Sequence, residues 1–208
     1  MGRGRPRKVD PETALDASMK VFWQKGFEGT SMTDLTEATG MAKPGLYATF
    51  GDKEALYAKA LSHYFRGYGA SVMDDLVRSQ DPLHIVVRRF LNAVADATTD
   101  KATPGGCFVV NSINDCVNHP QQLEELTRSF DAERRGACTE RFREAHEKGE
   151  LPKETDPDTL AEFFAGQVVA LAVMGRAGRS REALDRFIDT AMSVIPDLES
   201  KQSFDTGF

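Results

Sequence analysis

The sequence has few cysteines and no long apolar run. The first shortage argues against a disulfide-rich protein, and the second argues against a membrane-spanning one. Its 208 residues include three cysteines, Cys107, Cys116 and Cys138, an odd number that does not suit a framework of disulfides. No stretch approaches the roughly eighteen uninterrupted apolar residues of a membrane span, and no apolar segment follows the basic N-terminus. We therefore expect a cytoplasmic protein whose thiols are reduced.

The residue patterns of enzymes and metal proteins are also missing. We find no nucleophile with a base and an acid at a known spacing, no glycine loop that would cradle phosphate, and no His-x-x-x-His pair. Cys107 and Cys116 would lie on opposite faces of one helix, and the pair Cys116 and His119 is too small a ligand set. We expect no enzymatic activity, no cofactor and no metal site.

Charge is unevenly distributed along the chain. The net charge is −6 overall. Residues 1–66 contain ten Lys and Arg against eight Asp and Glu, a net of +2, which leaves −8 for residues 67–208. A basic head on an acidic body would orient an encounter with DNA, because the head is drawn to phosphates while the body is repelled.

Helical periodicity runs through most of the chain. Capping residues, prolines, glycines and apolar spacings predict nine helices, at about residues 11–26, 32–39, 43–50, 53–78, 83–98, 107–118, 120–148, 157–176 and 181–195. No segment shows a convincing strand pattern. The sequence therefore predicts an all-α fold.

Residues 30–56 have the pattern of a helix-turn-helix. Two short helices meet at a turn formed by Gly40, and a third helix follows them. The second short helix would turn an outer face to the major groove, made of Lys43, Pro44, Gly45, Tyr47 and Thr49. For Tyr47 the alternative is packing against the first helix.

Residues 10–60 resemble the DNA-binding domain of the TetR/AcrR family of regulators, on the strength of the segment KPGLYATFGDKEAL at 43–56. The resemblance implies a transcriptional repressor that binds a palindromic operator as a homodimer. A small-molecule or thiol-reactive effector would release it from the DNA. The resemblance divides the chain into a basic arm (1–9), a DNA-binding domain (10–55), a ligand-sensing and dimerisation domain (56–198) and a tail (199–208). We expect the arm and the tail to be disordered.

The resemblance also implies which residues contact DNA. Lys43, Gly45, Tyr47 and Thr49 would approach base edges or nearby phosphates, with Lys43 reading guanine and Gly45 allowing close backbone approach. Anchors to the DNA backbone would be Thr30, Ser31 and Lys53. The arm contains Arg3, Arg5, Arg7 and Lys8, which resemble an AT-hook core; the alternative is a basic tail attracted to any phosphate.

An effector pocket would lie between the helices of the body. Candidate walls are Phe65, Phe90, Phe108, Ile113 and Phe130, and candidate polar anchors are Arg88, Asn111 and Asn114. Cys107 would open a helix whose dipole favours a thiolate, which suggests an electrophile-sensing or redox role. The alternatives are that the apolar residues belong to the core and that Cys107 is inert packing.

The last two predicted helices would form the dimer interface by the same resemblance. Candidate interface residues are Phe164, Val168, Leu171, Ala172 and Phe187, with burial inside the chain as the alternative. A second function also remains open, that of an architectural protein that binds A·T-rich DNA without an effector. Footprinting distinguishes the two, because a regulator protects a single palindromic site and an architectural protein protects dispersed A·T-rich DNA.

Overall fold

A computed structural model describes residues 9–115 and 119–196, and every regular element in these ranges is a helix. The predicted all-α fold is confirmed. The elements are α1 (Pro11–Lys25), α2 (Met32–Thr39), α3 (Lys43–Phe50), α4 (Lys53–Tyr64), η1 (Phe65–Gly69), α5 (Ala70–Arg78), α6 (Leu83–Thr99), α7 (Phe108–Asp115), α8 (Gln121–Glu147), α9 (Pro157–Arg176) and α10 (Arg181–Met192).

Side chains fix where the helices of the head begin. Asp10 accepts a hydrogen bond from the N–H of Thr13, and Asp52 accepts one from the N–H of Ala55, at 3.0 and 2.8 Å. Ser31 and Asp34 cap α2 reciprocally. Gly40 ends α2 in the left-handed conformation that glycine adopts without strain.

The helix predicted at 53–78 is a continuous rod with one irregular turn. Between α4 and α5 the five residues of η1 form a π-helical turn. Helical periodicity did not reveal this turn, because the apolar spacing on either side is compatible with an unbroken helix. Such turns are rare and occur often at functional sites.

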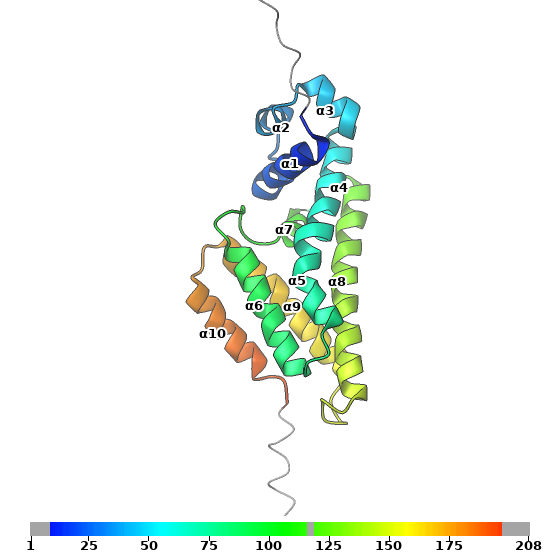
Figure 1. Ribbon diagram of the computed structural model, residues 1–208, viewed down its shortest axis with the longest axis vertical. Helices are drawn as coiled ribbons and strands as arrows, with labels where there is room; N and C mark the ends of the chain where they lie inside the picture. Colours follow the sequence, from blue (N-terminus) through cyan, green and yellow to red (C-terminus); the bar gives the residue numbers. More distant parts are fainter. Residues whose placement is uncertain (1–8, 116–118, 197–208) are drawn as a thin grey trace, which may run out of the picture.

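Figure 1 shows the head, α1 to α3, at one end of an elongated molecule. The rod of α4, η1 and α5 runs down from it beside α8, and α6, α9 and α10 complete the body. One apolar core joins the head helices to α7 and the start of α8, while a second fills the body. Because α4 belongs to the head and continues into the body, no linker lies at the predicted boundary near residue 55.

Helix α9 is long and apolar enough to cross a membrane by length and composition, with a mean hydropathy of 1.3. Its buried face, however, packs in the core against α6 and α8. Seven of its side chains are buried there: Leu160, Ala161, Phe164, Ala165, Val168, Leu171 and Ala172. The fold therefore uses α9 as a core helix of the body.

Candidate nucleic-acid interface and ligand cavity

Helix α3 projects from the head with one face buried and the other open. Leu46 and Phe50 anchor it in the core of the head. The other residues of α3 turn outward: Lys43, Pro44, Tyr47, Ala48 and Thr49 are exposed, and Gly45 is half-buried. Tyr47 is 43% exposed and does not belong to the apolar core of the head. The Lys43 ammonium lies 5.9 Å from the centroid of that ring.

The first turn of α3 is also open. Its N-cap residue, Ala42, makes no side-chain capping bond, whereas α1, α2 and α4 are capped by side chains. The helix contains no acidic residue. Pro44 has no N–H, and the N–H of Gly45 bonds to the carbonyl of Ala42 at 2.8 Å. The positive end of the helix dipole, with no acidic side chain beside it, therefore faces outward, which suits an anionic partner.

The predicted backbone anchors differ in how available they are. Thr30 is 2% exposed and donates its hydroxyl hydrogen bond to the carbonyl of Gly26 at 2.6 Å, so its prediction as a phosphate anchor is wrong. Ser31 is exposed, with its hydroxyl engaged in the cap of α2. Lys53 is half-buried, and its ammonium lies 4.3 Å from the centroid of the Phe27 ring. The arm residues Arg3, Arg5, Arg7 and Lys8 lie outside the described residues.

An ion pair holds the two helices before α3 together. The Lys25 ammonium of α1 lies 2.6 Å from the Asp34 carboxylate of α2. Hydrogen bonds from Lys25 and from the N–H and hydroxyl of Ser31 hold the pKa of Asp34 well below its usual range. The carboxylate thus stays charged and keeps α2 fixed on α1.

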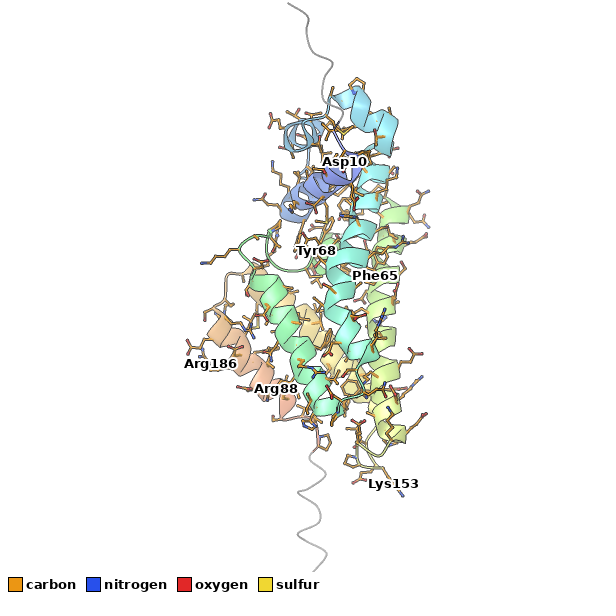
Figure 2. The ribbon with its side chains drawn as sticks, in the orientation of Figure 1. Asp10, Phe65, Tyr68, Arg88, Lys153 and Arg186 are labelled. Atoms are coloured by element: carbon orange, nitrogen blue, oxygen red, sulfur yellow. The ribbon has the colours of Figure 1, made fainter. Side chains whose placement is uncertain are left out.

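A cavity of about 170 Å³ lies where the head meets the body. Four of the predicted effector residues line it: Phe65, Phe90, Cys107 and Phe130. The rings of Phe65 and Phe130 are stacked with their centroids 4.3 Å apart. Figure 2 labels Phe65 and Tyr68 at this level of the rod, just below the head.

The other five predicted effector residues do not line this cavity. Arg88 is an exposed residue of α6 that pairs with Asp189 of α10 at 2.6 Å, away from Phe65 in Figure 2. Asn114 is exposed, and Phe108 and Ile113 pack in the core of the head. Asn111 lines a separate, smaller hollow beside Arg176. Helical spacing predicted an inward face for these residues but not which interior space they would reach.

Sequence reasoning missed several cavity residues. The aromatic ones are Trp23, Tyr64 and Tyr68, and Arg134 is the cationic one. Tyr68 lies four residues after Tyr64 and three after Phe65, the spacings that place side chains on one helix face, and that cluster was a usable signal. Trp23 gave no such signal, because it belongs to α1 of the head.

The two described cysteines, Cys107 and Cys138, are both free thiols in different surroundings. Cys107 is half-buried, lines the cavity and precedes α7, where its carbonyl accepts a hydrogen bond from Asn111. Burial, and secondarily the neighbouring Cys107, raises the pKa of Tyr64 well above its usual value. Cys138 is enclosed in the body core, and burial raises the pKa of its thiol to about 11. Cys107 is therefore the more accessible of the two.

Arg176, the last residue of α9, ties the body to the head. Its guanidinium donates hydrogen bonds to the carbonyls of Trp23 and Gln24 at the end of α1, at 3.2 and 2.9 Å. Gly106 packs directly against it: a Cβ atom there would lie 3.1 Å from the Cβ of Arg176. The loop that ends at Cys107, the end of α9 and the end of α1 thus meet at one point.

A second connection joins α4 to α7. The hydroxyl oxygens of Tyr57 and Ser112 are 2.7 Å apart in the buried core. Ser112 donates to the carbonyl of Phe108, so Tyr57 is the donor in this pair.

The outward face of α9 differs from the predicted dimer face. Phe164, Val168, Leu171 and Ala172 are at most 5% exposed and pack inside their own chain, so their assignment to the interface is wrong. The prediction took the most apolar face of the helix, which a core helix turns inward. The outward stripe consists of Phe163, Gly166, Ala170 and Val173 on α9, Ala183, Phe187 and Thr190 on α10, and Val194, which follows α10. Ala170, Ala183 and Phe187 are half-buried. Only Phe187 of the predicted set belongs to it.

The chain matches two family models. Residues 14–60 match the model of bacterial regulatory proteins of the tetR family. Residues 86–191, about half of the chain, match the C-terminal domain of tetracyclin repressor-like proteins. The two matches correspond to the head with α4 and to the body.

Curated relatives and solved structures agree with these matches. The HTH-type transcriptional repressor ComR of Escherichia coli (strain K12) is 32% identical over 196 residues, which are 94% of this chain and 93% of ComR. The repressor DhaR of Mycobacterium sp. (strain GP1) is 25% identical, over 89% of this chain and 92% of DhaR. A cysteine variant of the regulator CifR, solved with a 26-base-pair operator DNA, is 33% identical and superposes with a TM-score of 0.81, over 93% of this chain and 100% of that one. The chain belongs to the TetR family of DNA-binding transcriptional regulators.

Proposed function

We propose that the protein is a repressor that binds a palindromic operator as a homodimer and is released when a small-molecule or thiol-reactive effector enters the cavity. The observation that carries the proposal is the exposed face of α3, an uncapped helix end with Lys43, Gly45, Tyr47 and Thr49 turned outward. In this reading α3 enters the major groove. Lys43 reads a guanine, Gly45 lets the backbone approach, and Ser31 and Lys53 flank the groove.

A second copy of the chain would pack on the outward stripe of α9 and α10. Phe163 and Val173 are exposed apolar side chains, and Gly166 and Ala170 are small enough for close helix approach. Two copies joined in this way would present two α3 helices to successive major grooves, about 34 Å apart.

Deleting residues 1–8 tests the role of the basic arm. We expect operator affinity to fall and the slope of log affinity against log salt to become shallower by about 2–4, since each neutralised phosphate contributes about 0.9. Fluorescence anisotropy with labelled operator at several salt concentrations measures both. An unchanged slope would exclude the arm from the complex. An AT-hook predicts a further loss when flanking A·T pairs are replaced by G·C, and a simple basic tail does not.

Alkylation tests the thiol-reactive effector. We expect N-ethylmaleimide to abolish the operator complex of the wild type in a gel shift but not that of Cys107→Ser. The Cys107 sulfur would bond to one alkene carbon of the maleimide, and the thiol proton would end on the other. The added group would then occupy the cavity that Cys107 lines.

The control for alkylation is Cys116→Ser, which should behave as the wild type. The thiol of Cys138 should react slowly, because burial raises its pKa to about 11. Release of the operator from alkylated Cys107→Ser would remove Cys107 as the sensor.

A further inference from the structure

The cavity beside Trp23 has the size of one aromatic ring. Its volume is about 170 Å³, and a protein cavity of about 150 Å³ lined by apolar side chains is known to bind benzene. The size alone therefore favours a single-ring compound.

The walls favour an aromatic ligand. Six aromatic side chains line the space, contributed by four helices and the π-helical turn: Trp23, Tyr64, Phe65, Tyr68, Phe90 and Phe130. The ring of Trp23 meets those of Tyr64 and Tyr68 edge to face, with centroids 4.8 and 6.0 Å apart. A planar ligand ring between such walls gains the offset and edge contacts that aromatic pairs prefer.

Most polar groups of the walls already have partners. The hydroxyls of Ser71, Thr98 and Thr103 donate to backbone carbonyls. The guanidinium of Arg134 bonds to the carbonyl of Ala165 and to Asp131, and Asp100 accepts from the N–H of Ala102. The one cation among the described lining residues, Arg134, is thus already paired with Asp131, and the one carboxylate, Asp100, is exposed to solvent. A charged ligand buried in the cavity would therefore find no free counter-charge in the buried part of the walls, which favours an uncharged one.

The indole N–H of Trp23 differs from these groups. Trp23 is 2% exposed, and its Nε1 has no hydrogen-bond partner among residues 9–115 and 119–196. An unpaired buried donor is costly, and a ligand oxygen that accepts from it removes that cost.

We propose that the cavity binds an uncharged single-ring aromatic compound with one oxygen acceptor, and that the acceptor takes the N–H of Trp23. The inference rests on the proposed release by an effector and names its chemical class. Because Trp23 belongs to α1 and its carbonyl is held by Arg176, the ligand would contact the DNA-binding head directly.

Calorimetric titration of the full chain without DNA tests the ligand class. The probes are acetophenone, ethylbenzene without the carbonyl, cyclohexyl methyl ketone without the aromatic ring, and 2-acetylnaphthalene with a second ring. We expect acetophenone to bind about fivefold more tightly than ethylbenzene and about fivefold more tightly than cyclohexyl methyl ketone. We expect no binding of 2-acetylnaphthalene. Equal affinity for acetophenone and ethylbenzene would overturn the acceptor, and tight binding of the naphthalene would overturn the size limit.

The variant Trp23→Phe keeps a ring and removes the donor. It should lose the preference for acetophenone over ethylbenzene and keep the preference for an aromatic ring. The matched control is Tyr68→Phe, which removes a hydroxyl from the same cavity and should keep both preferences. Loss of the carbonyl preference in Tyr68→Phe but not in Trp23→Phe would overturn the assignment to Trp23.

A measurement on the wild type covers the case in which Trp23→Phe does not fold. The chain has one tryptophan, so a ¹⁵N–¹H correlation spectrum contains one indole signal. Saturation with acetophenone should shift this signal downfield and ethylbenzene should shift it less; an unmoved signal would refute the contact. A gel shift separates the two proposals: binding of acetophenone without release of operator leaves the cavity assignment intact and contradicts release by an effector.

Discussion

We expect the variant Gly166→Arg to prevent formation of the proposed dimer and to lower operator affinity by about 10³-fold or more. Gly166 is exposed on the outward stripe of α9, and a Cβ atom placed there meets nothing within 4 Å in its own chain. Arginine also has a higher helix propensity than glycine, so the protomer should fold at least as well as the wild type. The large side chain and its charge would nevertheless prevent close approach of a second α9. A monomer contacts only one half-site, and its affinity should then be close to that for non-specific DNA.

The matched control is Gly136→Arg. Gly136 is an exposed residue of α8 whose added Cβ also meets nothing within 4 Å, and it lies outside the stripe. Light scattering after size-exclusion chromatography should give a dimer for this variant and a monomer for Gly166→Arg, and anisotropy with labelled operator measures the affinity. If Gly166→Arg remained a dimer with full affinity, the two chains would have to meet on another surface.

The variant Gly45→Ala should change protein stability and DNA affinity in opposite directions. Gly45 lies in the first turn of α3, and an added Cβ would make an ordinary contact of 3.6 Å with the Cε of Met41. Alanine should therefore raise the free energy of unfolding, by up to about 1 kcal/mol. If the α3 backbone approaches the DNA here, the same methyl group overpacks the complex, at about 1–3 kcal/mol, or roughly 5- to 150-fold in affinity.

Thermal denaturation measures the change in stability, and operator binding on the same preparation measures the change in DNA affinity. Gly136→Ala is the control, because it makes the same helix-stabilising change on α8 and should leave DNA affinity unaltered. A Gly45→Ala variant that is stabilised and binds operator as tightly as the wild type would mean that the backbone at residue 45 stays clear of the DNA.

The head was predictable from sequence because its signals are local. Caps at Asp10, Ser31 and Asp52 and the turn at Gly40 place the starts of α1 to α4 to within a residue or two. The burial of Thr30 was not predictable in this way, because its hydroxyl bonds to a carbonyl of the preceding turn rather than to a helix terminus. The outer face of α3 followed from spacing alone.

The body was less predictable, because its cavity depends on contacts between distant segments. Phe65, Phe90 and Phe130 were found as inward aromatic residues, while Trp23 reaches the same space from another part of the chain. Helical periodicity distinguishes an inward from an outward face, but it cannot say whether an apolar face meets its own core or a second copy. For this reason the dimer residues were placed on the buried side of α9.

The contacts of Arg176 and Tyr57 affect which spacing between two operator half-sites the protein can accept. Arg176 holds α1 to the body, and Tyr57 holds α4 to α7, so the head is fastened to the body at two points. In the dimer that we propose, two heads held in this way would fit best to half-sites separated by one fixed number of base pairs. Correct half-sites one base pair too far apart would also be rotated about 34° around the DNA axis. Under this proposal the length of the spacer would contribute to specificity, and isolated half-sites elsewhere in the genome would compete only weakly for the protein.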